Sequence, residues 1–405
     1  MFESLEVLPK AEVESRHTRL RHELKRLCPD AGGMLVFSRP NIYYLSGCLA
    51  SGVMWLPLEG DPVLLVRKGI GRAQLESPLQ HIYEFRSYSQ LKDILAEAGS
   101  PLTPIVAAAM NGLPWSLGNL LTAKLKGTSF LSGDMSLAVT KAVKSPWELE
   151  KIRLTGARHH KGLHDILPER IQPGMTEREI SIAVWNVFFE LGHQGIMRME
   201  NDGEEIFLGH ISAGDSANYP SVFNGPVGLR GEHPAIPFMG YAGKVWQKGE
   251  PLTIDVGFIL EGYHTDKTQV YYAGKKVPDD IQKAHDVCIE VQNFASSKLK
   301  AGGVPSAVYA DVLQLVEKAG MSEGFMGLGK NKVPFLGHGI GLSIDGYPVI
   351  ARGFDEPVEE RMTIALEPKM GIAGVGMVGV ENTFEVTSTS AVCITGDAFN
   401  IVTVE

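Results

Sequence analysis

The sequence predicts two domains, an α/β domain in the N-terminal part of the chain and an α+β domain in the C-terminal part. Three observations support this prediction. The chain has 405 residues, which is more than one ordinary compact domain contains. In the first part, short apolar runs are bounded by Gly, Pro or Asp, as buried strands are. In the second part, long helical periodicities lie among strand-like segments, which is typical of an α+β domain.

The N-terminal elements follow from these patterns. Charged residues with spaced leucines over 11–27 predict a helix. Ser145-Pro146 precedes a helical pattern, and serine at the N-cap with proline at the first helical position is a helix-start signature. We therefore place the domain boundary there, with domains of residues 1–146 and 147–405. Strands are expected at 34–37, 53–57, 62–66 and 105–109.

The C-terminal domain combines helices and strands. Thr176 and Glu179 form a predicted capping box at the start of a helix with one apolar face. Further helices are expected at 280–299 and 305–319. Strands are expected at 251–260, 267–273, 362–368, 378–387 and 399–404.

Composition excludes several classes of protein. The formal net charge of -9 argues against nucleic-acid or anionic-membrane partners, which favour basic surfaces. The four cysteines are scattered without a CxxC pair, so neither a disulfide framework nor a thiolate zinc site is expected. No secretory signal or apolar membrane span is visible in the sequence. We therefore expect a cytoplasmic protein.

Acidic residues interrupt several apolar strands. In PLTIDVGFIL, period-2 alternation places Asp255 opposite Leu252, Ile254 and Val256. Eleven residues later Asp266 is expected to open the next strand, after a Gly262-Tyr263 turn, so that a hairpin brings the two carboxylates together. The same pattern recurs at Glu367 in RMTIALEPKM, at Glu381 in MVGVENTFEV and, as an imidazole between glycines, at His338 in LGHGIGL.

Each of these residues alone has an ordinary structural explanation, but their order and spacing together predict a metal site. A buried carboxylate is costly unless it is paired or bound to metal, and four clustered carboxylates raise one another's pKa values. Two divalent cations would cancel their charges. Oxygen ligands with one imidazole suit Mn, Co, Fe or Zn. Two such ions can share a bridging water and lower its pKa.

The order of these motifs resembles the pita-bread metallopeptidase family M24, in its creatinase, prolidase and aminopeptidase P branch. The segments VFSRPNIYYLSG (36–47), KSPWELEKIR and IQPGMTEREI are similar to the N-terminal domain of that branch and to the entry into its catalytic domain. The resemblance implies that Asp255 chelates one metal, that Asp266 and Glu381 bridge both, and that His338 and Glu367 complete the other. It also implies that Glu367 accepts the proton of the bridging water, and that the protein is a homodimer.

The sequence departs from the family pattern at several positions. Asp345 stands where prolidases and aminopeptidases P have a second histidine after GHGIGL, and Gly379 stands where an arginine is common. The turn that matches the substrate-contacting histidine ends in Ser221. His233 and His210 are alternative candidates for that role. A carboxylate at position 345 can bind a cationic group or act as a second base, and it is equally well explained as a turn residue.

We therefore predict a metal-dependent hydrolase of small peptides, an Xaa-Pro dipeptidase or Xaa-Pro aminopeptidase. An alternative is a pita-bread enzyme that acts on a small non-peptide substrate, as a creatinase-like C–N hydrolase or a dimethylsulfoniopropionate-type lyase, because the usual histidines and the arginine are replaced. A non-enzymatic binding protein is a third alternative, which the complete ligand set disfavours.

Overall fold

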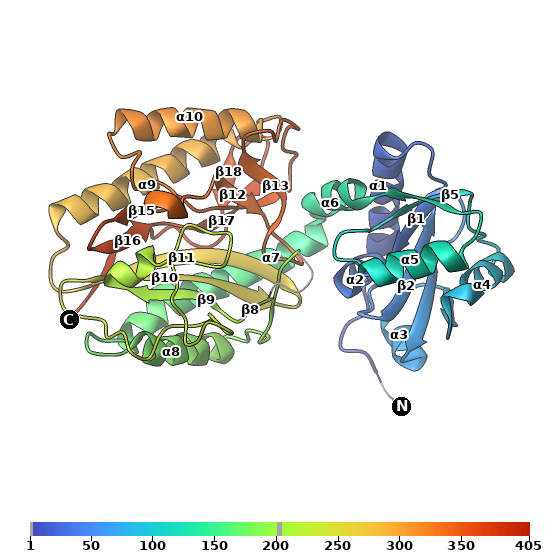
Figure 1. Cartoon of the computed structure of the whole chain (residues 1–405), viewed down its shortest axis with the longest axis horizontal. Helices are drawn as coiled ribbons and strands as arrows, with labels where there is room; N and C mark the ends of the chain where they lie inside the picture. The colour runs from blue at the N-terminus through green and yellow to red at the C-terminus, as the bar shows by residue number, and fades with distance from the viewer. Residues whose placement is uncertain (1–2, 201–204) are drawn as a thin grey trace. The chain divides into compact units, whose positions relative to one another are not determined.

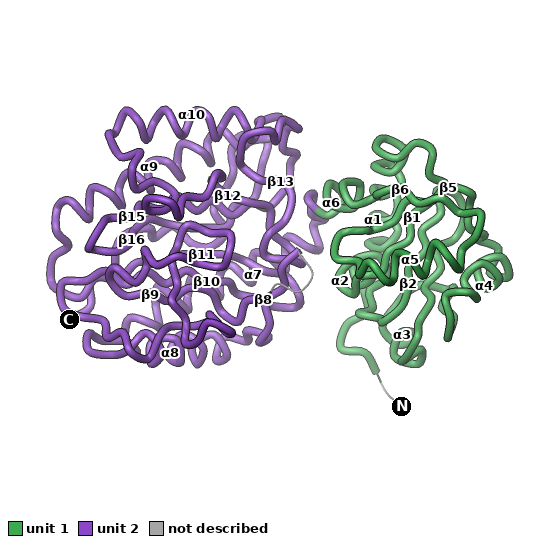
Figure 2. Tube along the Cα trace, in the orientation of Figure 1, with its two compact units in different colours: residues 1–141, 201–203 green, residues 142–200, 204–405 purple. Residues whose placement is uncertain are grey.

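A computed structural model describes residues 3–200 and 205–405 of the chain. The described residues up to Lys141 form one compact unit and those from Ala142 form a second (Figure 2). This division lies close to the boundary of 146 and 147 that the sequence predicts. Among the described residues, no helix has both the length and the apolar character needed to cross a membrane.

The N-terminal unit is built on one mixed sheet with helices packed around it (Figure 1), and the strand order of this sheet is β4-β3-β2-β1-β5-β6. Antiparallel pairs join β1 to β2 and β2 to β3, and parallel pairs join the outer strands. The strands are β1 (Gly33–Val36), β2 (Ser51–Pro57), β3 (Val63–Lys68), β4 (His81–Glu84), β5 (Ile105–Ala108) and β6 (Ser129–Ser132). The helices are α1 (Lys10–Leu27), α2 (Arg39–Ser46), α3 (Ile70–Glu76), α4 (Leu91–Glu97), α5 (Trp115–Lys124) and α6 (Asp134–Ala142).

The strands that the sequence predicts in this unit are those that the sheet buries. Leu35, Trp55, Leu65 and Val106, from β1, β2, β3 and β5, are fully buried in its core. The edge strands β4 and β6 are largely exposed. They were not predicted, because an exposed edge strand carries no apolar run by which to recognise it.

The C-terminal unit has longer elements. Its helices are α7 (Pro146–His160), α8 (Glu177–Glu190), α9 (Asp279–Lys298) and α10 (Pro305–Lys318). Its strands are β7 (Met197–Arg198), β8 (Glu205–Ile206), β9 (Gly209–Ala213), β10 (Pro251–Leu260), β11 (Tyr263–Ala273), β12 (Phe335–Gly339), β13 (Gly346–Ala351), β14 (Thr363–Leu366), β15 (Lys369–Ile372), β16 (Gly376–Gly379), β17 (Asn382–Val386), β18 (Ala391–Cys393) and β19 (Val402–Val404).

These strands form sheets of mostly antiparallel pairs. One sheet has the order β19-β11-β10-β9, another the order β13-β12-β14-β17-β18, and β15 pairs with β16. Helix α7 packs on β10 and β11, α8 on β9, and α9 on β15 and β16, while α10 packs on α9 and β13. Figure 1 shows α9 and α10 at the top of this unit and α8 at the bottom. The sheets and their connections therefore lie between layers of helix.

Local chemistry explains where the first helices of this unit begin. The Ser145 side chain accepts a hydrogen bond from Glu148 N, and the Glu148 carboxylate accepts one from Ser145 N. The same reciprocal pair joins Thr176 and Glu179 at the start of α8. Both helix starts that the sequence predicts are confirmed, because capping depends only on residues within one turn.

The hairpin that carries the first two acidic residues differs from the prediction. Leu260 pairs directly with Tyr263, so the turn consists of Glu261 and Gly262, both with positive φ. Strand β11 therefore starts at Tyr263, and Asp266 lies inside the strand rather than opening it. A two-residue turn with both central residues at positive φ matches the twist of paired strands, which is why the hairpin closes so tightly.

Candidate metal centre

The β10–β11 hairpin brings the first two acidic residues to one region of the sheet. Asp255 lies in β10, opposite Thr268 of β11 on one side and His210 of β9 on the other. Asp266 lies opposite Gly257, two residues along the same ladder and so on the same face of the sheet. The Thr268 hydroxyl donates a hydrogen bond to Asp255 Oδ1. The hairpin therefore holds both carboxylates close together, as the sequence predicts.

His338 comes from the neighbouring sheet. It lies in β12, between β13 and β14, opposite Ala365. A side chain at Gly337 would meet Ala365 O at 2.1 Å, and one at Gly339 would meet Tyr347 O at 2.0 Å. The expectation that these glycines allow a close approach of the backbone is confirmed, and this approach fixes where the imidazole lies.

The remaining acids lie where strands end. Glu367 directly follows β14. Glu381 lies between β16 and β17, where its backbone forms an isolated antiparallel β-bridge with that of Thr268. His338 Nε2 is 3.6 Å from Glu367 Oε1 and 3.8 Å from Glu381 Oε1. All five residues predicted as metal ligands therefore belong to one cluster of the C-terminal unit.

The cluster fits a divalent metal ion on the side of His338. Asp266, His338 and Glu381 each offer a ligand atom, and these atoms lie within 4.8 Å of one another. Glu381 Oε1 is buried and has no hydrogen-bond partner among the described residues. A buried polar atom without a partner requires an explanation such as a bound ion. Carboxylate oxygens with one imidazole nitrogen are a suitable donor set for such an ion.

Burial and mutual repulsion of carboxylates dominate the electrostatics of the cluster. Burial raises the pKa values of Asp266, Glu367 and Glu381 well above their usual range, and the neighbouring carboxylates raise them further, although Lys369 opposes both effects. Asp255 differs. Burial alone would raise its pKa, but Lys369 and hydrogen bonds outweigh burial and lower it. The positive charge of Lys369 therefore outweighs burial at Asp255 and not at the other three carboxylates.

Lys369 also lies in the cluster, although the sequence does not predict it there. Its side chain is fully buried. The ammonium Nζ donates to Glu381 Oε2 at 3.0 Å and lies 3.5 Å from Asp255 Oδ1. Burial alone would lower its pKa, but Asp255, Glu381 and Glu367 raise it overall. Its position two residues after Glu367 in an apolar segment was the available signal, because period-2 spacing places both side chains on one side.

Of the two candidate histidines, the structure brings His210 to the cluster. His210 is buried, its Cα pairs with that of Asp255, and its Nε2 is 3.2 Å from Ser221 Oγ. Burial lowers its pKa, and Asp255 partly opposes this shift. His233 is exposed, and its Nδ1 accepts a hydrogen bond from Ala235 N in its own turn. Which of the two histidines lies beside the cluster thus depends on strand pairing, which the sequence does not display.

Asp345 lies at the edge of the cluster. Its side chain is half-buried, and Oδ1 accepts a hydrogen bond from Glu200 N at 2.7 Å. Its negative charge contributes to the raised pKa of Asp266. Asp345 therefore acts on the cluster through its charge and also anchors the segment that contains Glu200.

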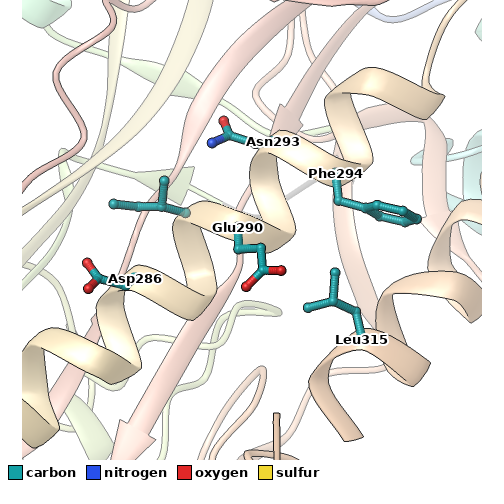
Figure 3. Close-up of a pocket in the computed structure, with 6 residues that line it drawn as sticks. Asp286, Glu290, Asn293, Phe294 and Leu315 are labelled. Atoms are coloured by element: carbon teal, nitrogen blue, oxygen red, sulfur yellow. The ribbon is translucent and has the colours of Figure 1, made fainter. Parts of the chain in front are cut away.

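Two hollows in the described part of the C-terminal unit differ in how they relate to the cluster. A cavity of about 210 Å³ is lined by Ser221, Phe223 and Met377, among others, and Ser221 connects it to His210 and hence to Asp255. A wider hollow of about 530 Å³ lies along α9, with Phe294 facing Leu315 of α10 (Figure 3). None of the predicted ligands lines either hollow, but the first reaches the cluster through Ser221 and His210, whereas no residue that lines the second contacts the cluster in this way.

Comparison with protein families decides the assignment. The model of metallopeptidase family M24 matches residues 150–388, and that of the creatinase/prolidase N-terminal domain matches residues 16–138. The chain belongs to metallopeptidase family M24. The predicted family, and the fold class of an α/β domain followed by a pita-bread domain, are both confirmed, and with them the class of metallopeptidase-type hydrolase.

Individual relatives agree with this assignment. The chain is 25% identical to a probable dipeptidase PepE of Mycobacterium tuberculosis over 293 residues, which cover 72% of this chain and 68% of the relative. It is 22% identical to an Xaa-Pro dipeptidase of Pyrococcus furiosus over 354 residues, which cover 87% of this chain and 89% of the relative.

Solved structures show the same fold. An X-Pro aminopeptidase from Thermotoga maritima superposes with a TM-score of 0.75 at 21% identity, over 95% of this chain and 99% of that chain. Dipeptidase PepE from Mycobacterium ulcerans superposes with a TM-score of 0.78 at 20% identity, over 98% of this chain and 100% of that chain. Both superpositions therefore extend over nearly the whole chain, including its N-terminal domain.

Proposed function

We propose that the protein is a metal-dependent peptidase that cleaves small Xaa-Pro peptides, as a dipeptidase or aminopeptidase. The observation that carries this proposal is the buried cluster of Asp255, Asp266, Glu367 and Glu381 with His338, which would be unfavourable without a bound cation. The relatives named as dipeptidases and Xaa-Pro dipeptidases support the choice of substrate.

In this proposal some residues of the cluster would hold the metal ion and another would accept a proton. Asp266, His338 and Glu381 would hold a divalent ion, which would supply a water of lowered pKa and a Lewis acid for the scissile carbonyl. Glu367 is the proton acceptor in this proposal, because its buried carboxylate lies 3.6 Å from His338 Nε2, beside the residues that would hold the ion.

The surroundings of His210 support a substrate with a proline ring. The ring of Phe223 packs edge-on against His210 at 5.5 Å between centroids, and Phe238 packs against Phe223 at 5.7 Å. Of these rings, Phe223 lines the small cavity, where it forms an apolar wall beside Ser221. Such a wall suits a compact apolar ring better than a charged side chain. His210 is the substrate-contacting histidine in this proposal, and Asp345 is a further candidate for contact with a cationic amine.

Finer properties also belong to the proposal. Manganese, cobalt, zinc and iron all suit a site of carboxylates and one imidazole. A homodimer and a cytoplasmic location rest on the resemblance to the family and on the composition of the chain. His233 keeps its predicted catalytic role only as an alternative to His210.

The test is hydrolysis of a peptide panel by the full chain. The protein is stripped with a chelator, reloaded with Mn²⁺, Co²⁺ or Zn²⁺, and offered Xaa-Pro dipeptides and tripeptides beside proline-free controls. Glu367→Gln is expected to lower kcat by about 10²–10⁴-fold, the range for loss of a general base. Glu385→Gln is the matched control, because Glu385 lies in β17 of the same region and pairs with Arg153 outside the cluster.

Three outcomes bear on the proposal. Metal-dependent cleavage of Xaa-Pro bonds that is lost in Glu367→Gln and kept in Glu385→Gln supports it. Cleavage of proline-free peptides at equal rates would refute the proline specificity. Metal binding without cleavage of any peptide would refute the peptidase and favour a small non-peptide substrate.

A further inference from the structure

The position of Lys369 bears on how many metal ions the site holds. Its ammonium lies 3.0 Å from Glu381 Oε2 and 3.5 Å from Asp255 Oδ1. These two carboxylates are the ones that, with Asp266, would hold the first of two ions. The position of the second ion would lie among Asp266, His338 and Glu381, whose ligand atoms lie within 4.8 Å of one another. The Lys369 ammonium therefore lies on one side of Glu381, and the other predicted ligands, Asp266 and His338, lie on the other side.

The two oxygens of Glu381 show the same division. Oε2 accepts the hydrogen bond from Lys369 and lies 3.4 Å from the Thr268 hydroxyl. Oε1 is buried without a hydrogen-bond partner among the described residues and faces His338 Nε2 at 3.8 Å. Oε2 thus has hydrogen-bond partners within the chain, and Oε1 is left for a bound ion.

The strand register explains how the lysine reaches this place. Lys369 of β15 pairs directly with Gly379 of β16, and residues paired across antiparallel strands present their side chains on the same face. Gly379 has φ 135°, and a Cβ there would meet Pro368 O at 2.4 Å. Position 379, where an arginine is common in the family, thus contributes no side chain, and its neighbour across the ladder supplies a cation instead.

We propose that the Lys369 ammonium takes the place of one of the two metal cations, so that the site holds a single divalent ion between Asp266, His338, Glu367 and Glu381. This inference rests on the proposed metal-dependent function and specifies its metal content. A carboxylate oxygen binds a metal ion at about 2.0–2.2 Å, closer than it binds an ammonium. An ion on the Asp255 side would therefore need the oxygens that Lys369 now contacts, and the two cations would repel each other.

The charges of the cluster can be counted for one ion and for two. Asp255, Asp266, Glu367 and Glu381 carry four negative charges when all are ionised. A divalent ion and the ammonium together oppose three of these, and two divalent ions with the ammonium would exceed them by one. The contacts of Lys369 with Asp255 and Glu381, rather than the count of charges, therefore carry the inference of one ion.

The experiment measures metal content directly. The stripped full chain is titrated with Mn²⁺, the stoichiometry is obtained by calorimetry and elemental analysis, and the electron paramagnetic resonance spectrum is recorded. The wild type is expected to bind one Mn²⁺ per chain with the spectrum of an isolated ion. Lys369→Ala, which removes the ammonium and opens space, is expected to bind two per chain with the spectrum of a spin-coupled pair. Lys244→Met is the control, because Lys244 forms a lysine–glutamate pair with Glu250 outside the cluster, and it should bind one.

The wild-type stoichiometry and a second variant keep the test decisive if Lys369→Ala does not fold. Asp255→Asn is expected to bind one Mn²⁺ per chain, the same number as the wild type, because Asp255 does not hold the remaining ion, whereas a two-ion site would lose one ion from the wild-type number in this variant. Two Mn²⁺ per wild-type chain with a coupled spectrum would overturn this inference and leave the proposed peptidase standing. A wild-type chain that takes up no Mn²⁺, Co²⁺ or Zn²⁺ would overturn both.

Discussion

Removal of the Lys369 charge should destabilise the metal-free protein. Lys369→Met keeps an apolar side chain of similar length and deletes the ammonium, which leaves Asp255 and Glu381 without the cation that now lies 3.5 Å and 3.0 Å from them. All three groups are buried or nearly so. Removal of one partner from a buried ion pair costs about 3–5 kcal/mol, because the remaining charge is left uncompensated.

The size of the effect can be checked from the contacts. Each hydrogen bond to a charged group contributes about 1.5–3 kcal/mol, so a hydrogen bond to Glu381 and a close charge contact with Asp255 agree with that range. The partly exposed pair of Lys244 and Glu250 gives the control, because Lys244→Met should cost only about 1 kcal/mol or less.

Hydrogen exchange with chelator present is the suitable assay, because it reads each unit separately. A loss of 3–5 kcal/mol raises the exchange of globally protected amides by roughly 10²–10⁴-fold, since about 1.4 kcal/mol corresponds to a factor of ten. Peptides from α9, β15 and β17 should show this increase, and peptides from β1 and β2 of the N-terminal unit should not. A metal-free Lys369→Met protein as stable as the wild type would refute the reasoning, and Mn²⁺ should restore stability to the variant.

Two further predictions concern stability elsewhere in the chain. His17 is buried and its Nε2 forms a hydrogen bond with Leu45 O. Burial lowers the pKa of this imidazole from 6.5 to about 4. As pH falls below 6.5 the unfolded chain takes up a proton that the folded chain does not, so the free energy of unfolding of the N-terminal unit should decrease, by about 2 kcal/mol between pH 7 and pH 5. Urea unfolding at both pH values should show this dependence, and its persistence in His17→Gln would contradict the assignment. Gly379→Ala should cost about 1–3 kcal/mol through strain at φ 135° and the clash with Pro368 O, whereas Gly225→Ala, which meets no atom within 4 Å, should be neutral in the same assay.

The helix starts and the buried strands were predictable because their causes are local. The capping boxes at Ser145 and Thr176 require only residues within one turn. Alternation along β10 identified Asp255 as an acid in a buried strand. The edge strands β4 and β6 were not predictable, because their side chains are mostly exposed and leave no apolar pattern.

The sequence by itself selected the five predicted ligand residues, since acids and a histidine in apolar segments are costly wherever the chain places them. Tertiary structure decided which other groups meet them. Only the β15–β16 register brings Lys369 to Asp255 and Glu381, opposite a glycine. Only the β9–β10 pairing brings His210 to Asp255. These contacts join residues that are distant in the chain, and pairing between strands far apart in sequence depends on the packing of the whole sheet rather than on local pattern.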